Sequence, residues 1–164
     1  IIDCETTGLN PKSNRIIEIA ALKVSNGEVV DRFSTLINPQ KNVTRKITQM
    51  TGITNEMLMD APFAEDVIVD FINFIDGNVI IGYNVNFDLN FLKETLNRMN
   101  RVIGIVHYVD MLKIARKRVE GVDDYRLETV VKKINPDFQQ SHRALDDCSA
   151  TKKPFWRDVE NSYY

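Results

Sequence analysis

The chain has 164 residues, the length of one ordinary domain, and 43% of them are hydrophobic, which is enough for a buried core. The net charge of −2 argues against a broad basic surface for nucleic acid, although carboxylates gathered in one site would make even a nuclease look acidic. No run approaches the ~20 apolar residues of a membrane span, and no signal peptide opens the chain. We therefore expect a cytoplasmic single domain over residues 1–164, with no membrane partner.

The first part of the chain predicts an antiparallel meander. Ile16–Val24 is an apolar run rich in Ile and Val, typical of a central strand. Asn26-Gly27 is a hairpin turn signal that joins this run to the next one. The three predicted strands are Ile1–Cys4, Ile16–Val24 and Val29–Ile37. Because the chain begins inside an apolar run, we expect strand residues or a larger segment to precede it in the natural protein.

The rest of the chain alternates between helical and strand patterns. Ala64–Ile75 places its apolar residues on one helical face, and Val79–Gly82 is a short apolar strand. The other expected elements are helices at Lys46–Gly52, Phe87–Met99, Met111–Arg118, Leu127–Ile134 and from Ala144 onward, and a strand at Ile103–Val109. Pro154 should end or kink the last helix. A meander followed by helical crossovers predicts an α/β domain of RNase H-like fold, with a mixed five-stranded sheet flanked by helices.

Two carboxylates occupy alternate positions of the first strand. Asp3 and Glu5 should point to the same face, while Cys4 points the opposite way into packing. Adjacent carboxylates repel each other, and a hard divalent cation is the usual reason to place them together. The alternative is a solvated acidic strand end. Thr6-Thr7-Gly8 follows as a tight turn whose backbone could approach a ligand closely.

Two later segments add further acidic groups. Asp88 falls in the first turn of a predicted helix, where it could equally be an ordinary favourable charge at a helix start. His142 stands five residues before Asp147, on a loop or helix start that lets both side chains reach one site. A lone His is otherwise a surface or capping residue. Asp146 would point roughly 100° away from Asp147 around a helix and should be exposed or structural.

Together these groups resemble the three motifs of the DEDDh (DnaQ-like) 3′–5′ exonucleases. The motifs are Asp-x-Glu-Thr-Thr-Gly at 3–8, Asn-x-x-Phe-Asp at 84–88 and His-x-x-x-x-Asp at 142–147. The stretches 15–20 and 51–58 also look like this family, which includes the epsilon proofreading subunit and the PolC exonuclease domain of bacterial DNA polymerase III. The resemblance runs from residue 1 to about residue 152.

The resemblance implies that Asp3, Glu5, Asp88 and Asp147 bind two divalent metal ions, Mg²⁺ or Mn²⁺, and that His142 is the general base. It also implies hydrolysis at the 3′ end of DNA, single-stranded or frayed, with release of nucleoside 5′-monophosphates in proofreading or repair. The residues that it implies around the terminal nucleotide are Thr6, Thr7, Gly8, Leu9, Gln49, Thr51, Tyr83, Asn84 and Phe87. Tyr83 and Thr51 stand where relatives often carry His, which predicts altered nucleotide and sugar contacts.

Several alternatives stay open. An RNA-directed exonuclease of the same family would carry the same motifs, because these do not choose the sugar. A non-catalytic nucleic-acid-binding module on this fold is a second alternative, although its usual mark would be the loss of a catalytic residue. A polymerase subunit is a possible partner of the domain. The two cysteines, Cys4 and Cys148, form no CxxC pair and are expected to be reduced thiols.

Overall fold

The computed structural model describes residues 1–102, 104, 107–138 and 141–160, with side chains as far as Lys152. Its first three strands form the predicted meander: β1 (Ile2–Thr6), β2 (Ile16–Ser25) and β3 (Glu28–Leu36) are antiparallel in the order β1-β2-β3. Asn26 and Gly27 both have positive φ, 50° and 80°, which suits a tight hairpin whose twist matches the strands. β2 is buried along most of its length, as expected of the central strand.

Two further strands, β4 (Ile80–Gly82) and β5 (Tyr108–Asp110), pair in parallel and complete the five predicted strands. In the described residues the five are hydrogen-bonded as a sheet of three and a sheet of two rather than as one continuous sheet. β4 nevertheless lies against β1, because a Cβ on Gly82 would stand 3.2 Å from the carbonyl oxygen of Ile2. The predicted strand at 103–109 begins only at Tyr108, and residues 103, 105 and 106 lie outside the described part of the chain.

The helices follow the predicted pattern closely. Three have the predicted bounds, α3 (Ala64–Ile75), α5 (Met111–Arg118) and α6 (Leu127–Ile134), and three differ by a residue or extend further, α1 (Arg45–Thr51), α4 (Asn86–Arg98) and α7 (Ala144–Glu160). Gly52 ends α1 in the left-handed conformation, with φ 72°. The short helix α2 (Asn55–Met59), capped by Thr54, was not predicted. Pro154 does not end α7, since the helix continues to Glu160, and the alternative that Pro154 kinks the helix stays a prediction.

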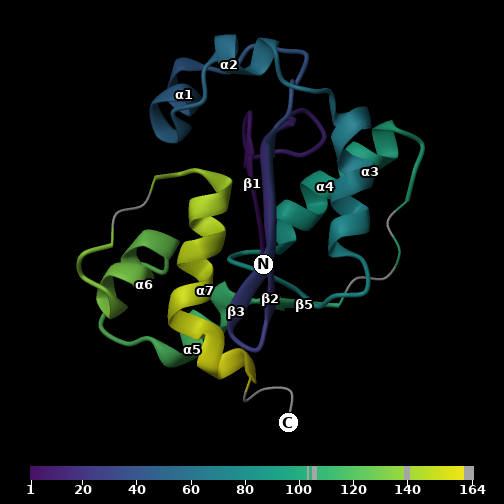
Figure 1. Cartoon of the computed structure of the whole chain (residues 1–164). Coiled ribbons are helices and arrows are strands. Elements are labelled where there is room, and N and C mark those ends of the chain that lie inside the picture. Colours follow the sequence, from purple (N-terminus) through teal and green to yellow (C-terminus); the bar gives the residue numbers. More distant parts are fainter. Residues whose placement is uncertain (103, 105–106, 139–140, 161–164) are drawn as a thin grey trace.

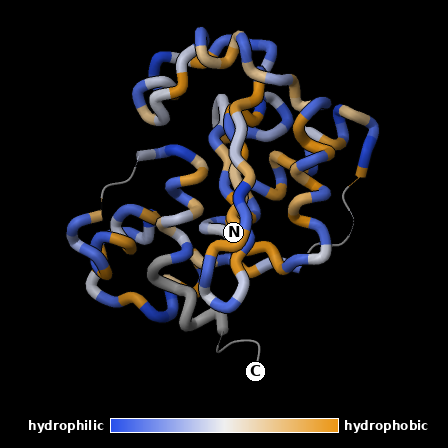
Figure 2. Tube along the Cα trace, in the orientation of Figure 1, coloured by the Kyte–Doolittle hydropathy of each residue, from blue (hydrophilic) through white to orange (hydrophobic). Residues whose placement is uncertain are grey.

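The helices cover both faces of the three-stranded sheet (Figure 1). On one face, α3 and α4 pack against β1 and β2 through a large apolar core that contains Phe71 and Phe91, both fully buried. On the other face, α7 packs through Ala144 and Cys148 against apolar side chains of β2. Hydrophobic residues are concentrated along the central strands, whereas the loops are mostly hydrophilic (Figure 2). No helix in the described residues is long and apolar enough to cross a bilayer. The α7 face is the one that carries the acidic site.

Candidate active site

Three of the predicted carboxylates meet between β1 and α7. Asp3, Glu5 and Asp147 each present an oxygen, and these three atoms lie within 4.8 Å of one another. The strand alternation puts Asp3 and Glu5 on the same face, where both are half-buried, and the first turn of α7 brings Asp147, which is 5% exposed. An all-oxygen set of this kind suits a hard divalent cation such as Mg²⁺ or Mn²⁺.

Burial and the neighbouring carboxylates both oppose ionisation of Asp3 and Glu5. Burial, followed by the charges of Asp147 and Glu18, raises the pKa of Glu5 to about 8. Burial and the charges of Asp88 and Asp147 likewise raise the pKa of Asp3 well above its ordinary range. A bound cation would relieve this repulsion, because an opposite charge nearby favours the ionised form of a carboxylate. Three of the four predicted metal ligands therefore form a donor set whose oxygen atoms and negative charge suit a divalent cation.

Asp88, the fourth predicted ligand, lies beside this cluster rather than within it. It belongs to the first turn of α4 and is 5% exposed. Its Oδ1 accepts hydrogen bonds from the backbone N and from Sγ of Cys4, both at 3.0 Å. Burial raises the pKa of Asp88 to about 7, although these bonds lower it. Asp88 shares a small pocket with Asp3, so it adds negative charge next to the cluster while one of its oxygens is bonded to β1.

The predicted general base, His142, stands immediately before α7 and is half-buried. Its backbone is in the left-handed region, with φ 51°, which is uncommon for a residue other than Gly. Among the causes that lower the pKa of Glu128 on α6, the hydrogen bond from Lys132 comes first and His142 is a minor one. His142 does not belong to the group of Asp3, Glu5 and Asp147 whose oxygens lie within 4.8 Å of one another.

An ion pair that was not predicted, between buried Glu18 and partly exposed Arg143, joins β2 to the start of α7. Glu18 is 2% exposed and is paired with Glu5 in the register of β1 and β2. The guanidinium of Arg143 donates to both Glu18 oxygens, with Nε at 3.0 Å from each and Nη2 at 2.6 Å from Oε1. The backbone N of Ala144 also donates to Oε2 at 3.0 Å. Because Arg143 and the helix start occupy both its oxygens, Glu18 is not a fourth member of the metal-ligand set.

Sequence patterns contained one signal for this pair. Glu18 is an acidic residue inside the apolar run of β2, and a buried carboxylate requires a partner. Arg143 follows directly after the predicted base, but nothing in the sequence says that its partner lies 125 residues earlier.

The turn after β1 is held mainly by its own hydrogen bonds. Thr6 Oγ1 donates to the carbonyl of Gly8 at 2.8 Å, and Thr7 Oγ1 donates to Asn14 Oδ1 at 3.1 Å. A Cβ on Gly8 would stand 2.7 Å from Asn14 Oδ1, so only Gly fits there without a shift of Asn14. These contacts leave Leu9 85% exposed at the tip of the turn. Of the predicted nucleotide contacts in this segment, Leu9 is the side chain with the most accessible surface.

Three cationic side chains donate hydrogen bonds to backbone carbonyls of the same turn. Arg98, at the end of α4, donates to the carbonyls of Pro11 and Lys12. Lys41 Nζ donates to the carbonyl of Ser13 at 3.1 Å, and Arg15 Nη1 donates to that of Asn14 at 3.0 Å. The four consecutive carbonyls of residues 11–14 are thus bound by three cations, which holds the turn and the exposed Leu9 in place.

The residues in and beside the second motif that were predicted to contact the nucleotide make contacts within the protein. Tyr83 donates its hydroxyl to the carbonyl of Tyr125 at 2.6 Å, and burial is the first cause that raises its pKa to about 12. Phe87 packs on Phe91 with ring centroids 4.9 Å apart. Asn84 is exposed at φ 60°, and its backbone N donates to Asp110 at 3.0 Å. Asp110, a buried residue that sequence reasoning missed, therefore holds the turn that leads to Asp88.

The two predicted contacts on α1 differ from each other. Gln49 is exposed, whereas Thr51 is 2% exposed and its hydroxyl donates to the carbonyl of Ile47 at 3.0 Å. The same Oγ1 accepts from the backbone N of Ile53 at 3.1 Å, so Thr51 serves the end of α1. Two other expectations are confirmed: Asp146 is exposed and accepts from Ser141 at 2.6 Å, and both cysteines are buried free thiols.

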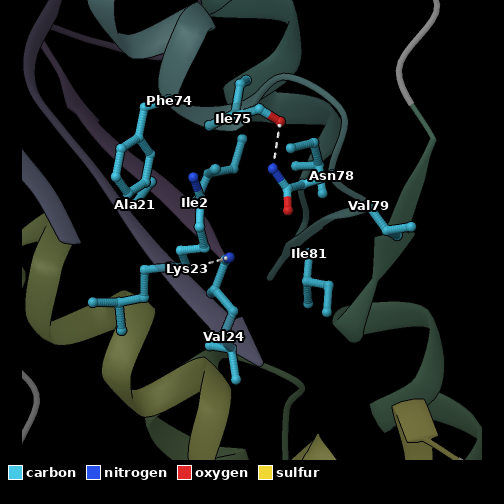
Figure 3. Close-up of a pocket in the computed structure, with 12 residues that line it drawn as sticks. Ile2, Ala21, Lys23, Val24, Phe74, Ile75, Asn78, Val79 and Ile81 are labelled. Atoms are coloured by element: carbon cyan, nitrogen blue, oxygen red, sulfur yellow. Dashed lines mark hydrogen bonds between the residues drawn. The ribbon is translucent and has the colours of Figure 1, made fainter. Parts of the chain in front are cut away.

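An apolar pocket lies at the start of β1 and is separate from the acidic site. Ile2, Phe74 and Ile81 line it, and Lys23 stands over the ring of Phe74 at 4.6 Å from its centroid (Figure 3). None of the predicted site residues borders this pocket. The acidic cluster between β1 and α7 is therefore kept as the candidate active site.

Fold and site define a class: an α/β domain that gathers carboxylates from its first strand and its last helix. The exonuclease family profile matches residues 1–155, and the chain belongs to that family. It is 38% identical over 160 residues to the PolC-type DNA polymerase III of Thermotoga maritima, covering 98% of this chain and 12% of the relative. The PolC-type enzyme of Bacillus subtilis is 37% identical over 152 residues, covering 92% of this chain and 11% of the relative. The chain thus spans about an eighth or less of these relatives.

Solved structures agree with this assignment. A structure of exonuclease X in complex with 5′ overhanging duplex DNA matches with a TM-score of 0.73 and 26% identity, over 99% of this chain and 92% of that one. Escherichia coli exonuclease I bound to a dT13 oligonucleotide matches with a TM-score of 0.81 over 99% of this chain and 42% of that one. At 20% identity the second likeness supports the fold alone.

Proposed function

We propose that this domain is a metal-dependent 3′–5′ exonuclease that hydrolyses the terminal phosphodiester bond of DNA and releases nucleoside 5′-monophosphates. The observation that carries the proposal is the meeting of Asp3, Glu5 and Asp147 within 4.8 Å, at the motif positions expected of the family to which the chain belongs. Carboxylates at such close quarters repel each other, and a divalent cation explains why they are kept together.

In this proposal Asp3, Glu5 and Asp147 bind one divalent ion, and Asp88 beside Asp3 contributes to a second one. Two such ions, when bound, would supply activation of the attacking water and neutralisation of charge on the leaving 3′ oxygen. Mg²⁺ and Mn²⁺ are the ions that this oxygen-only set prefers.

His142 acts as the general base that accepts the proton of the attacking water. It stands two residues before α7 and five residues before Asp147, and it lies outside the group formed by Asp3, Glu5 and Asp147. A general base often reaches hydrogen-bonding distance of the attacking water only in the substrate complex, so this placement is compatible with the role.

The substrate in this proposal is the 3′ end of a DNA strand, single-stranded or frayed. Two observations support DNA over RNA: the relatives are PolC-type DNA polymerases, and exonuclease X was solved with duplex DNA. Exposed Leu9 and Gln49 would contact the terminal nucleotide together with the backbone of Thr6 and Thr7. Because the relatives are PolC-type DNA polymerases III, we also propose a cytoplasmic setting next to a polymerase, with proofreading as its role.

The test is degradation of a 5′-labelled single-stranded DNA with Mg²⁺, with Mn²⁺ and with EDTA, beside an RNA of the same sequence. Asp147→Asn is the informative variant, and Asp146→Asn is its matched control, because Asp146 is the exposed neighbour on the same helix. We expect a metal-dependent ladder that shortens from the 3′ end of DNA, is lost in Asp147→Asn and persists in Asp146→Asn. Shortening of RNA alone would favour the exoribonuclease, and no cleavage of either strand would favour a binding module.

A further inference from the structure

The helix that carries Asp147 packs on the sheet through small side chains, through weak hydrogen bonds from Cys148 Sγ to the carbonyls of Ile1 and Ala20, and through a charged contact at its start. Ala144 and Cys148 pack against Ala20 and Leu22 of β2. Small residues allow a helix to approach closely, but they leave its position along its axis and its rotation weakly determined. The hydrogen bonds from Arg143 and Ala144 to Glu18 are directional, so they fix the position and the rotation of the helix at its start.

From this geometry we infer that Glu18 and Arg143 are positioning residues that hold the start of α7 so that Asp147 meets the β1 carboxylates. The inference rests on the proposed function. Arg143 directly follows His142, and its carbonyl accepts the helical hydrogen bond from the N of Asp147 at 3.0 Å. Glu18 in turn pairs in register with Glu5, one of the carboxylates that Asp147 must meet. The ion pair therefore connects the start of α7 to the strand position beside Glu5.

The charge of Arg143 has a second effect at this position. A buried Glu18 without a partner would add another negative charge beside Glu5 and Asp3, which already repel each other. Arg143 neutralises Glu18 and saturates its oxygens, so that Glu18 neither repels the cluster fully nor competes for a cation. The pair thus keeps the ligand set at Asp3, Glu5 and Asp147 while holding the helix that brings the last of these.

The variants that test this inference are Arg143→Gln, Arg143→Lys and Glu18→Gln. Arg143→Gln removes the charge, Arg143→Lys keeps it but loses the two-pronged donor, and Glu18→Gln keeps the size of the acceptor. Arg126→Gln is the matched control, because Arg126 pairs with Asp124 at 3.5 Å in an exposed position on another element. Each protein is measured for thermal midpoint, for Mn²⁺ affinity by electron paramagnetic resonance, and for kcat and KM on single-stranded DNA.

Residues that orient metal ligands typically change metal affinity or activity by about 10- to 100-fold when substituted. We expect Arg143→Gln and Glu18→Gln to lose Mn²⁺ affinity and kcat by about this factor, with KM little changed, at temperatures where they stay folded. Arg143→Lys should recover part of both losses, and Arg126→Gln should match the unmodified protein. A lower thermal midpoint with unmodified Mn²⁺ affinity and kcat would overturn the inference, because the pair would then only stabilise the fold.

The Mn²⁺ measurement separates this inference from the proposed function. If the unmodified protein binds Mn²⁺ but cleaves neither DNA nor RNA, the proposed reaction fails, while the change of Mn²⁺ affinity in the variants still supports or overturns the positioning role. If the unmodified protein binds no Mn²⁺, both proposals are overturned.

Discussion

The two sides of the acidic site are built in different ways. On the β1 side, Asp3 and Glu5 stand two residues apart, and the strand alternation alone turns both to the same face. On the α7 side, Asp147 belongs to a helix whose start is hydrogen-bonded to Glu18, 125 residues before Arg143. The comparison teaches that local geometry presents Asp3 and Glu5, while tertiary contacts bring Asp147 to them.

The largest effect is expected on the β1 side. Asp3→Asn keeps the size of the side chain but removes a charge from the centre of the cluster, where Asp3 lies near both Asp88 and Asp147. Metal ions contribute several kcal/mol of transition-state stabilisation, so we expect activity to fall by about 10³-fold or more. Initial rates of 3′ shortening with Mg²⁺ measure it. Activity within tenfold of the unmodified protein would remove Asp3 from the ligand set.

His142→Ala separates two roles near the start of α7, because His142 is proposed to accept the proton of the attacking water, whereas Asp147 is proposed to bind the cation. The rate should fall by about 10²–10⁴-fold, the usual contribution of a general base, while Mn²⁺ affinity stays unchanged. Asp147→Asn should lose both. A His142→Ala variant that loses Mn²⁺ as well would assign His142 to the metal site instead.

The pH dependence of stability tests the repulsion within the cluster. The folded protein raises the pKa of Glu5 from the ordinary 4.5 to about 8, so it binds this proton more tightly than the unfolded chain does. The stability that results is present at low pH and is lost as the pH rises from about 4.5 to about 8.

Without divalent ions we therefore expect the thermal midpoint to fall across this interval, and Mg²⁺ or Mn²⁺ to restore it most strongly at the alkaline end. Differential scanning fluorimetry at pH 5.5, 7 and 8.5, with and without EDTA, measures this, and Glu5→Gln should flatten the curve. A midpoint that rises with pH in EDTA would contradict the assigned electrostatics.

A smaller effect is expected at the turn that carries Leu9. Arg98→Gln removes the donors to the carbonyls of Pro11 and Lys12, so the turn should open more often. Trypsin should then cut after the exposed Lys12 several-fold faster, while Lys93→Gln, an exposed position on the same helix, should leave the rate unchanged. Equal cleavage rates in all three proteins would show that Arg98 does not hold the turn.

The smallest effect is expected at Tyr83, where the predicted nucleotide contact has a structural partner. Tyr83→Phe loses the hydrogen bond to the carbonyl of Tyr125 and should lower the free energy of unfolding by about 1 kcal/mol. Urea unfolding measures this loss, and KM for DNA should change less than twofold. A large rise in KM would indicate that the Tyr83 hydroxyl contacts the substrate.

Features that depend on local geometry could be predicted from the sequence, whereas features that depend on tertiary contacts could not. The meander, α3, α5 and α6 were predictable because their apolar periodicity and turn residues are local signals. Asp3 and Glu5 were predictable for the same reason, and the resemblance of the third motif added Asp147. The bond between Asp88 and Cys4, the Glu18–Arg143 pair and the partner of Tyr83 depend on contacts between residues 42 or more apart, which no local pattern encodes. The short α2 has too few residues for its periodicity to be read.

The central claim is that carboxylates from β1 and α7 together hold the cation that acts on a DNA 3′ end. Crystals grown with Mn²⁺ and thymidine 5′-monophosphate, measured at the manganese absorption edge, test it most directly. The account predicts an anomalous peak in contact with Asp3, Glu5 and Asp147, with the nucleotide phosphate on the same ion. A peak elsewhere, or a nucleotide bound away from these three carboxylates, would contradict it.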